Sequence, residues 1–147
     1  MKKSAIVLLG LAVMANTTGC AEKEIDKEAL FDASGYEAVE TVNKTMGAKH
    51  EATYNEATNV ITITYVADID YVDYHKKMME ANMPLEFATS YSALLESCMK
   101  TSFTVSDMAN KDFEEAPIQV VFEAFSNDKV TKMFEMVDGI ETYNLFI

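Results

Sequence analysis

The segment after residue 67 is the densest group of possible metal ligands in the sequence. Asp68, Asp70 and Asp73 are followed closely by His75, and carboxylate oxygens are the ligands that Ca²⁺ prefers. The run does not fit an EF-hand loop that starts at Asp68, because its sixth position is Asp73 instead of glycine and its twelfth is Met79 instead of glutamate. We favour the interpretation that these carboxylates cap a helix, whose N-terminal end attracts anions.

A second possible metal site combines one histidine with several methionines. His75, Met78, Met79 and Met83 lie within nine residues, and imidazole with thioether sulfur is a ligand set that Cu(I) accepts. Flexible filling of a core explains 10 methionines in the chain more simply. We therefore expect no cofactor, and keep the handling of a metal (Cu or Ca) as the alternative function.

Cys98 is the one candidate nucleophile in the sequence, with His50 or His75 as its base. It falls on the apolar stripe of a helix predicted over residues 87–98, where a thiol acts as a small, inert hydrophobic group. No nucleophile elbow, zinc-protease motif, P-loop or dinucleotide fingerprint is present. The sequence therefore predicts that the protein is not an enzyme.

Tyr65, Tyr71 and Tyr74 are the candidate interaction residues, because tyrosine combines a large contact area with a polar end. They surround the predicted corner between a strand and a helix and could form one surface together with the aspartates. The alternative is that the three rings pack helices onto the sheet.

The helices that must position these side chains are read from the spacing of apolar residues. Ser34 and Glu37 match a capping box, which predicts a helix over residues 35–46. The aspartates open a second helix that runs to about Ala81, and the third covers residues 87–98. We expect a loop over residues 103–117, with one helical turn near Met108.

The strands follow from alternation of β-branched and polar residues. The clearest covers residues 60–66, and it can pair with residues 49–54 as a hairpin. Residues 130–137 fit either a helix or a strand. We favour the strand, because the turn pairs Asn127-Asp128 and Asp138-Gly139 flank it. The remaining strands are expected at residues 118–125 and 140–147.

Together these elements predict an α+β fold: an antiparallel sheet of two hairpins or a meander, with about three helices on one face. We expect a signal peptide at residues 1–19, a lipidated tether at 20–33 and a single domain at 34–147. This order of elements resembles small uncharacterised lipoprotein domains of Gram-positive bacteria. The likeness is carried by residues 60–66 and 118–134, and it implies no activity.

The first twenty residues have the layout of an export signal, with Lys2 and Lys3 before an apolar run over residues 5–15. Gly19-Cys20 at the end of this segment resembles the lipobox of bacterial lipoproteins, although Thr17 replaces the usual aliphatic residue. The resemblance implies cleavage before Cys20, acyl chains on its sulfur, and anchoring to the extracytoplasmic face of the cell membrane. The apolar run is too short for a permanent transmembrane helix.

The composition excludes some partners. The net charge is −12 and all 12 basic residues are lysine, so nucleic acid is not expected. Loss of residues 1–19 leaves 10 lysines against 24 acidic residues, and so a net charge of −14. The sequence predicts a lipid-anchored, extracytoplasmic, non-catalytic binding module whose partner is a protein or a cationic ligand.

Overall fold

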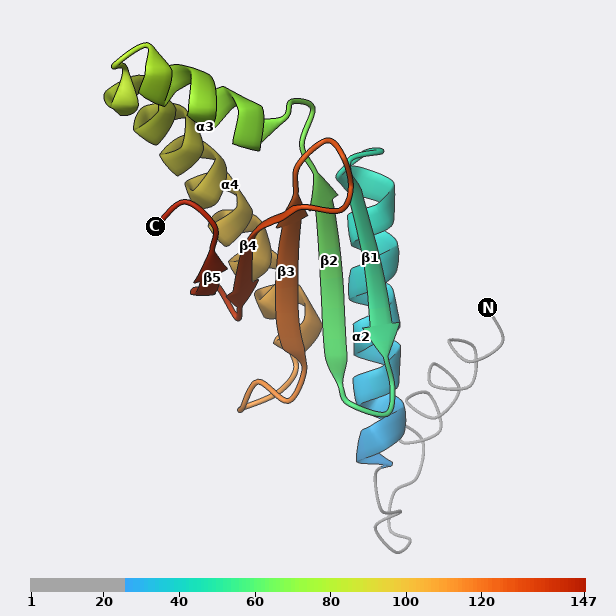
Figure 1. The fold of residues 1–147 in the computed structure, drawn as a ribbon. Helices are drawn as coiled ribbons and strands as arrows, with labels where there is room; N and C mark the ends of the chain where they lie inside the picture. Colours follow the sequence, from blue (N-terminus) through green and yellow to red (C-terminus); the bar gives the residue numbers. More distant parts are fainter. Residues whose placement is uncertain (1–25) are drawn as a thin grey trace, which may run out of the picture.

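The computed structural model describes residues 26–147, and the predicted signal peptide and Cys20 lie outside this part of the chain. The predicted α+β class is confirmed, because three helices accompany one five-stranded sheet here (Figure 1). In chain order the elements are α2 (Lys27–Thr45), β1 (His50–Asn55), β2 (Val60–Val66), α3 (Tyr71–Glu80), α4 (Pro84–Asn110), β3 (Gln119–Phe125), β4 (Lys132–Val137) and β5 (Ile140–Asn144).

The strands lie in the sheet in the same order as in the chain. β1 and β2 form the predicted hairpin, and β3, β4 and β5 form the predicted antiparallel meander. The two units join through a parallel pair, in which Ile63 of β2 lies opposite Phe122 of β3. A parallel pair needs a crossover connection, and α3 and α4 supply it. The sheet is therefore mostly antiparallel, with one parallel junction at its centre.

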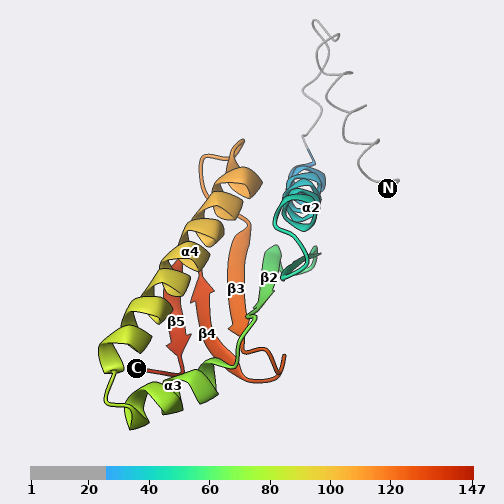
Figure 2. The same ribbon diagram turned by 90° about the horizontal axis from the view of Figure 1, so that it is seen from above.

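Two helices cover one face of the sheet. α2 packs against β1 and β2, α4 packs against β3 and β4, and the two helices touch each other (Figure 2). The side chains between these layers form the core, with Ile61, Ile63, Phe122 and Phe134 fully buried. α3 packs against α4 across one end of the sheet (Figure 1). No helix within residues 26–147 has both the length and the apolar composition needed to cross a bilayer.

The first described helix begins eight residues before its predicted start. Asp26 is its N-cap, and the carboxylate accepts a hydrogen bond of 3.2 Å from the backbone N–H of Ala29. Ser34, the predicted cap, lies inside α2 and donates its hydroxyl to the carbonyl of Ala109. Residues 27–33, assigned to the tether, are helical because Phe31 packs edge-on against Phe113, with 4.9 Å between ring centroids.

The predicted loop at residues 103–117 is wrong in its first half, because α4 continues to Asn110. The apolar stripe continues through buried Val105 and Ala109, although polar and β-branched residues of low helix propensity surround it. Asn110 then ends the helix: its side-chain amide donates to the carbonyl of Ile118 at 2.9 Å and accepts from its N–H at 3.1 Å.

In the ambiguous segment at residues 130–137, the favoured strand is present over Lys132–Val137, and one of its two predicted turns is correct. Asp138 and Gly139 have φ values of 50° and 78°, and they join β4 to β5 directly, as a tight hairpin turn requires. The connection between β3 and β4 spans residues 126–131 instead of the two predicted at Asn127-Asp128. In it, the Asp128 carboxylate accepts from the backbone N–H groups of Val130 and Thr131, both at 2.9 Å.

Candidate functional site

The aspartates at the start of α3 form hydrogen bonds and ion pairs with residues of the domain itself. Asp70 caps the helix and accepts from the N–H groups of Val72 and Asp73 at 3.0 and 2.9 Å, as the capping interpretation predicts. Asp73 pairs with Lys77 at 2.6 Å, and Asp68 pairs with Lys49. Within residues 26–147, no group of three or more His, Cys, Asp or Glu side chains is arranged to hold a metal ion.

The residues of the possible copper site have different environments. The His75 ring packs against Phe87 and Phe146, with centroids 4.7 and 5.1 Å away. Met78 packs against the core, whereas Met79 and Met83 are exposed. His75 and Met78 thus contribute to the apolar contact between α3, α4 and the C-terminal segment, and burial there explains their residue types.

Cys98 lies in the core. Its side chain is buried, and burial raises the pKa of its thiol to about 12. The thiolate is the nucleophilic form of cysteine, so this sulfur is inactive at neutral pH. The interpretation of Cys98 as a packing residue therefore accounts for its environment.

The three candidate interaction tyrosines pack elements together. Tyr71 is buried, which is a correction to its predicted place on an exposed surface, and its ring lies 5.9 Å from that of Tyr91. Tyr74 is partly buried against Phe87, and Tyr65 is partly buried beside the ring of His50. Burial, the largest cause, raises the pKa of Tyr65. These contacts follow the alternative reading, in which the rings fix helices on the sheet.

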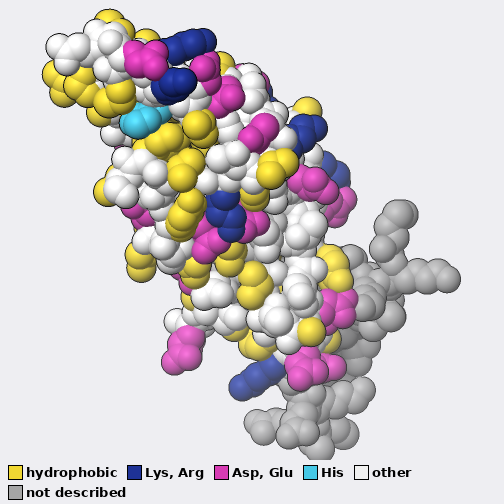
Figure 3. All heavy atoms as spheres, viewed as in Figure 1, with side chains coloured by type: hydrophobic (Ala, Val, Ile, Leu, Met, Phe, Trp, Pro, Cys, Tyr) yellow, Lys and Arg dark blue, Asp and Glu magenta, His cyan; other side chains and the backbone are white. Residues whose placement is uncertain are grey.

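The face of the sheet opposite α2 and α4, here called the open face, carries no helix in the described chain. The register sets its side chains in two rows that cross all five strands. One row is Glu51, Thr64, Glu123, Glu135 and Tyr143, and the other is Thr53, Thr62, Val121, Val137 and Ile140. Figure 3 shows hydrophobic side chains among charged groups over this face.

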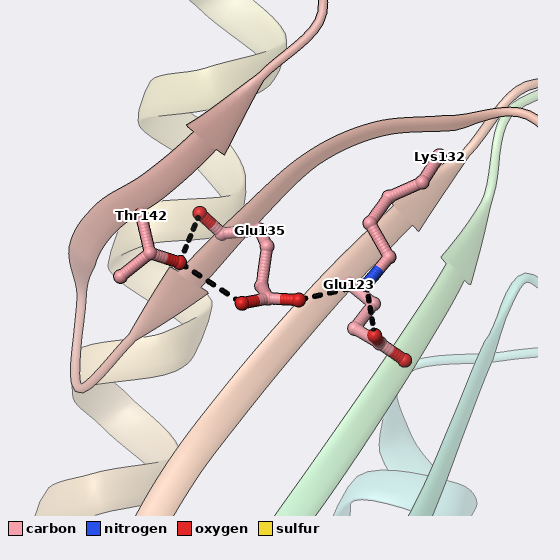
Figure 4. Close-up of polar contacts among 4 residues, drawn as sticks. All are labelled: Glu123, Lys132, Glu135 and Thr142. Carbon is pink, nitrogen blue, oxygen red and sulfur yellow. Dashed lines mark hydrogen bonds and ion pairs between the residues drawn. The ribbon is translucent and has the colours of Figure 1, made fainter.

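On the open face, a lysine lies between two glutamates where β3 and β4 pair (Figure 4). Glu123 and Glu135 lie opposite each other on β3 and β4, where two like charges would repel. The Lys132 Nζ lies 2.5 Å from the Glu123 carboxylate and 2.7 Å from the Glu135 carboxylate. Thr142 of β5 also donates to Glu135 at 3.0 Å. These four residues, here called the Lys132 cluster, link three strands.

The charges of the Lys132 cluster stabilise one another. Hydrogen bonds to Glu123 and Glu135 raise the pKa of Lys132, and the bond from Lys132 is the largest cause that lowers the pKa of Glu135. Both shifts favour the charged forms of Lys132 and Glu135. With two glutamates and one lysine, the cluster has one formal negative charge. It is therefore suited to hold the strands in register and to attract a positive group, and not to abstract a proton.

A shallow hollow of about 670 Å³ adjoins this cluster at the ends of β2 and β3. Lys49 and Lys129 line it together with Glu51, Asp68 and Glu123, so both signs of charge are present. The residues that complete its lining are Ala48, His50, Thr64, Val66, Ala67, Phe125 and Asn127.

His50 lines this hollow, and its ring also packs against two aromatic rings. The ring packs towards Tyr65 and Phe122 in the core, with centroids 4.9 and 6.2 Å away. Burial is the largest cause that lowers the pKa of His50, ahead of the charge of Lys49, while the carbonyl of Met46 opposes the shift. The imidazole is therefore neutral at pH 7.

The open face has the chemistry of a binding surface: exposed apolar groups, hydroxyls and fixed charges. Comparison with family models, with curated proteins and with solved structures found no match for the chain. The sequence did not single out the Lys132 cluster. Its one local signal is the spacing of Lys132 and Glu135, and the partner at Glu123 is found only when the register of β3 and β4 is known.

Proposed function

We propose that the chain is a lipid-anchored, extracytoplasmic binding module without catalytic activity, which presents its open face to a positively charged protein. The observation that carries this proposal is that the described residues cover only one face of the sheet, while the other face carries the Lys132 cluster. A face of this kind offers contact area for a partner.

The composition of the open face suits a protein partner. Val121, Val137 and Ile140 form an apolar row over β3, β4 and β5, and the side chain of Ile140 is 70% exposed. The Lys132 cluster lies in the neighbouring row, which begins with Glu51 on β1. Apolar contacts supply most of the binding free energy at such surfaces, while complementary charge gives specificity and speeds association.

The lipid anchor and the fold together define how the domain is oriented relative to the membrane. From Cys20 to Asp26 the chain can reach about 20 Å when extended, so a lipid on Cys20 holds the start of α2 near the bilayer. The start of α2 and the turn between β1 and β2 lie at one end of the domain, and the loop between β3 and β4 lies at the other (Figure 1). The hollow, which borders that loop, then faces away from the membrane.

Mass spectrometry of the protein purified from its host tests the anchor. The expected mature N-terminus is Cys20 with acyl chains, and a Cys20→Ala variant is expected to keep residues 1–19 and lose the lipid. A mature chain with a bare thiol at position 20 would overturn the lipid anchor.

Cross-linking in intact cells tests the open face. Glu51→Lys is expected to reduce any cross-linked partner at least fivefold, because it reverses an exposed charge on that face. The matched control is Glu115→Lys, which changes the charge equally in the loop before β3 and is expected to retain the partner. Equal loss in both variants would contradict binding through the open face.

A further inference from the structure

The exposed edge of β5 adjoins a groove against α4, and this is a second possible binding surface of the domain. We propose that this edge binds an extended basic peptide segment of a partner protein as a sixth strand, with alternate apolar side chains seated in the groove. The proposal needs neither the lipid anchor nor the open face, since it depends on a strand edge and a groove.

The edge of β5 is open in the described part of the chain. β5 is the last strand of the sheet and pairs only with β4 there. Four of its five residues are exposed, with Asn144 as the exception. The outer N–H and C=O groups of an edge strand are a template for another strand, and many peptide-binding domains use this mode.

The groove lies next to this edge. One face of α4 supplies Ser92, Leu95, Glu96 and Met99, whose spacing follows the helix turn. The facing wall consists of Met136, Gly139 and Glu141, and the groove has a volume of about 290 Å³. Figure 2 shows α4 running alongside β5 at this side of the sheet.

The side chains of an added strand would divide between two environments. In the register of the sheet, Glu141 lies opposite buried Met136 and so faces the groove. Tyr143 lies opposite Glu135 on the open face, because the register of β4 and β5 shifts between Glu135 and Met136. Successive residues of a strand point to opposite faces. Every second residue of the peptide therefore enters the groove, where Leu95 and Met99 favour an apolar group of the size of valine.

The charge at the groove selects a basic peptide. Glu96 and Glu141 are the two charged residues that line it. Glu96 forms an ion pair with Lys100 at 2.7 Å. Glu141 instead accepts a hydrogen bond of 2.9 Å from the neutral side-chain amide of Asn144. Within residues 26–147, no lysine forms an ion pair with Glu141. Lysine or arginine residues that flank the apolar residues of the peptide would therefore complement its charge.

A second copy of the chain fits this edge poorly. Antiparallel pairing of two β5 strands would place the groove-facing Glu141 of the copy near Glu141 and Glu96. Like charges across a strand pair are destabilising, and the net charge of −12 adds repulsion at longer range. A basic segment of another protein meets neither obstacle.

The test measures fluorescence anisotropy of a labelled heptapeptide of alternating lysine and valine, with the full chain in detergent. A glutamate–valine heptapeptide is the charge control. Two further lysine–valine peptides carry N-methyl groups, one on its valines and the other on its lysines. A strand paired on one side uses the N–H groups of every second residue, so one methylated peptide is expected to bind at least tenfold more weakly than the other.

Protein variants locate the site. Glu141→Lys is expected to weaken the lysine–valine peptide at least fivefold and to strengthen the glutamate–valine peptide, while Glu86→Lys, an exposed charge reversal at the start of the same helix, is expected to change both much less. Urea unfolding is measured for both variants, and both are expected to have the same midpoint as the wild type. Absence of peptide binding, equal binding of the two methylated peptides, or a concentration-dependent dimer blocked by Glu141→Lys would each overturn the proposal. None of these results bears on the acylation of Cys20.

Discussion

The two edges of the sheet differ in how their backbone groups are satisfied. At β1, Asn43 of α2 donates to the carbonyl of Ala52 at 3.0 Å and accepts from its N–H at 2.8 Å. The N–H of His50 bonds the carbonyl of Gly47 at 3.2 Å. At β5, no residue of the described chain closes the outer edge in this way. The fold therefore blocks strand addition at one edge and leaves it available at the other.

A glycine with positive φ stands at each edge, but the two glycines have different surroundings. Gly47 precedes β1 with a φ of 75°, and a Cβ added there would meet no atom within 4 Å. Gly139 precedes β5 with a φ of 78°, and a Cβ there would lie 2.6 Å from the ring of Phe103. The connection that leads into β1 therefore has free space around its glycine. The turn that leads into β5 is instead in contact with the ring of Phe103.

The largest effect is expected for Gly139→Ala. A left-handed alanine costs about 1–2 kcal/mol. The clash with Phe103 adds about 1 kcal/mol, the lower end of the cost of overpacking, because this ring is 48% exposed and can shift. The free energy of unfolding, measured by urea denaturation, is expected to fall by the sum of these contributions. Gly47→Ala is the matched control and is expected to lose about 1–2 kcal/mol, from backbone conformation alone. Equal losses in the two variants would show that the Phe103 contact does not constrain the turn at β5.

Asn43→Ala is expected to expose backbone groups at the outer edge of β1. Two hydrogen bonds are lost and the edge groups of Ala52 lose their partner, which costs about 1–2 kcal/mol. Sedimentation velocity is expected to show self-association that grows with concentration, because the variant has two open edges. The control is Thr45→Ala, which removes an exposed hydroxyl near the end of the same helix. A strictly monomeric Asn43→Ala variant would contradict the protective role of Asn43.

Lys132→Met tests the charges that hold the β5 side of the sheet. Without Lys132, Glu123 and Glu135 face each other unscreened, and the free energy of unfolding at pH 7 is expected to fall by about 1 kcal/mol. The lowered pKa of Glu135 means that this stabilisation is present above the pKa of an unfolded glutamate and is lost as the pH falls through the folded value. The difference between variant and wild type is therefore expected to shrink at low pH.

Lys76→Met provides the control for that experiment. Lys76 is exposed and lies 4.0 Å from Glu80, so its loss is expected to change the unfolding free energy by less than about 0.5 kcal/mol. A loss as large as that of Lys132→Met would mean that net charge, and not the Lys132 cluster, explains the effect.

Local patterns predicted what local interactions determine. The alternation of residues 60–66, the turn at Asp138-Gly139 and the cap at Asp70 each act within a few residues, and all three form as expected. The start of α2 was misplaced because two competing caps lie eight residues apart, and the contact of Phe31 with Phe113 joins residues distant in the chain.

The features that distinguish the two edges depend on long-range register. Asn43 finds Ala52 only after α2 folds back on β1. The Lys132 cluster needs Glu123 and Glu135 in opposition, and the groove needs α4 to continue beside β5. No periodicity within one segment encodes these arrangements, so the sequence predicted the layers of the fold and not the surfaces available for binding.

The smallest effect is expected from the pH dependence of the β1 edge. The pKa of His50 is lowered in the fold, chiefly by burial, so the unfolded chain binds a proton at higher pH than the folded chain does. The contribution of His50 to the free energy of unfolding is therefore fully present above the unfolded pKa of about 6.5. It decreases as the pH falls from that value to the folded pKa, and it does not decrease further at lower pH. Unfolding free energies at pH 7.5 and 5.5 are expected to differ less in His50→Gln than in the wild type.

Lys44→Gln, which alters an exposed charge on α2, is expected to retain the wild-type difference. If His50→Gln keeps that difference as well, the neutral imidazole at the edge of β1 does not contribute to the pH dependence.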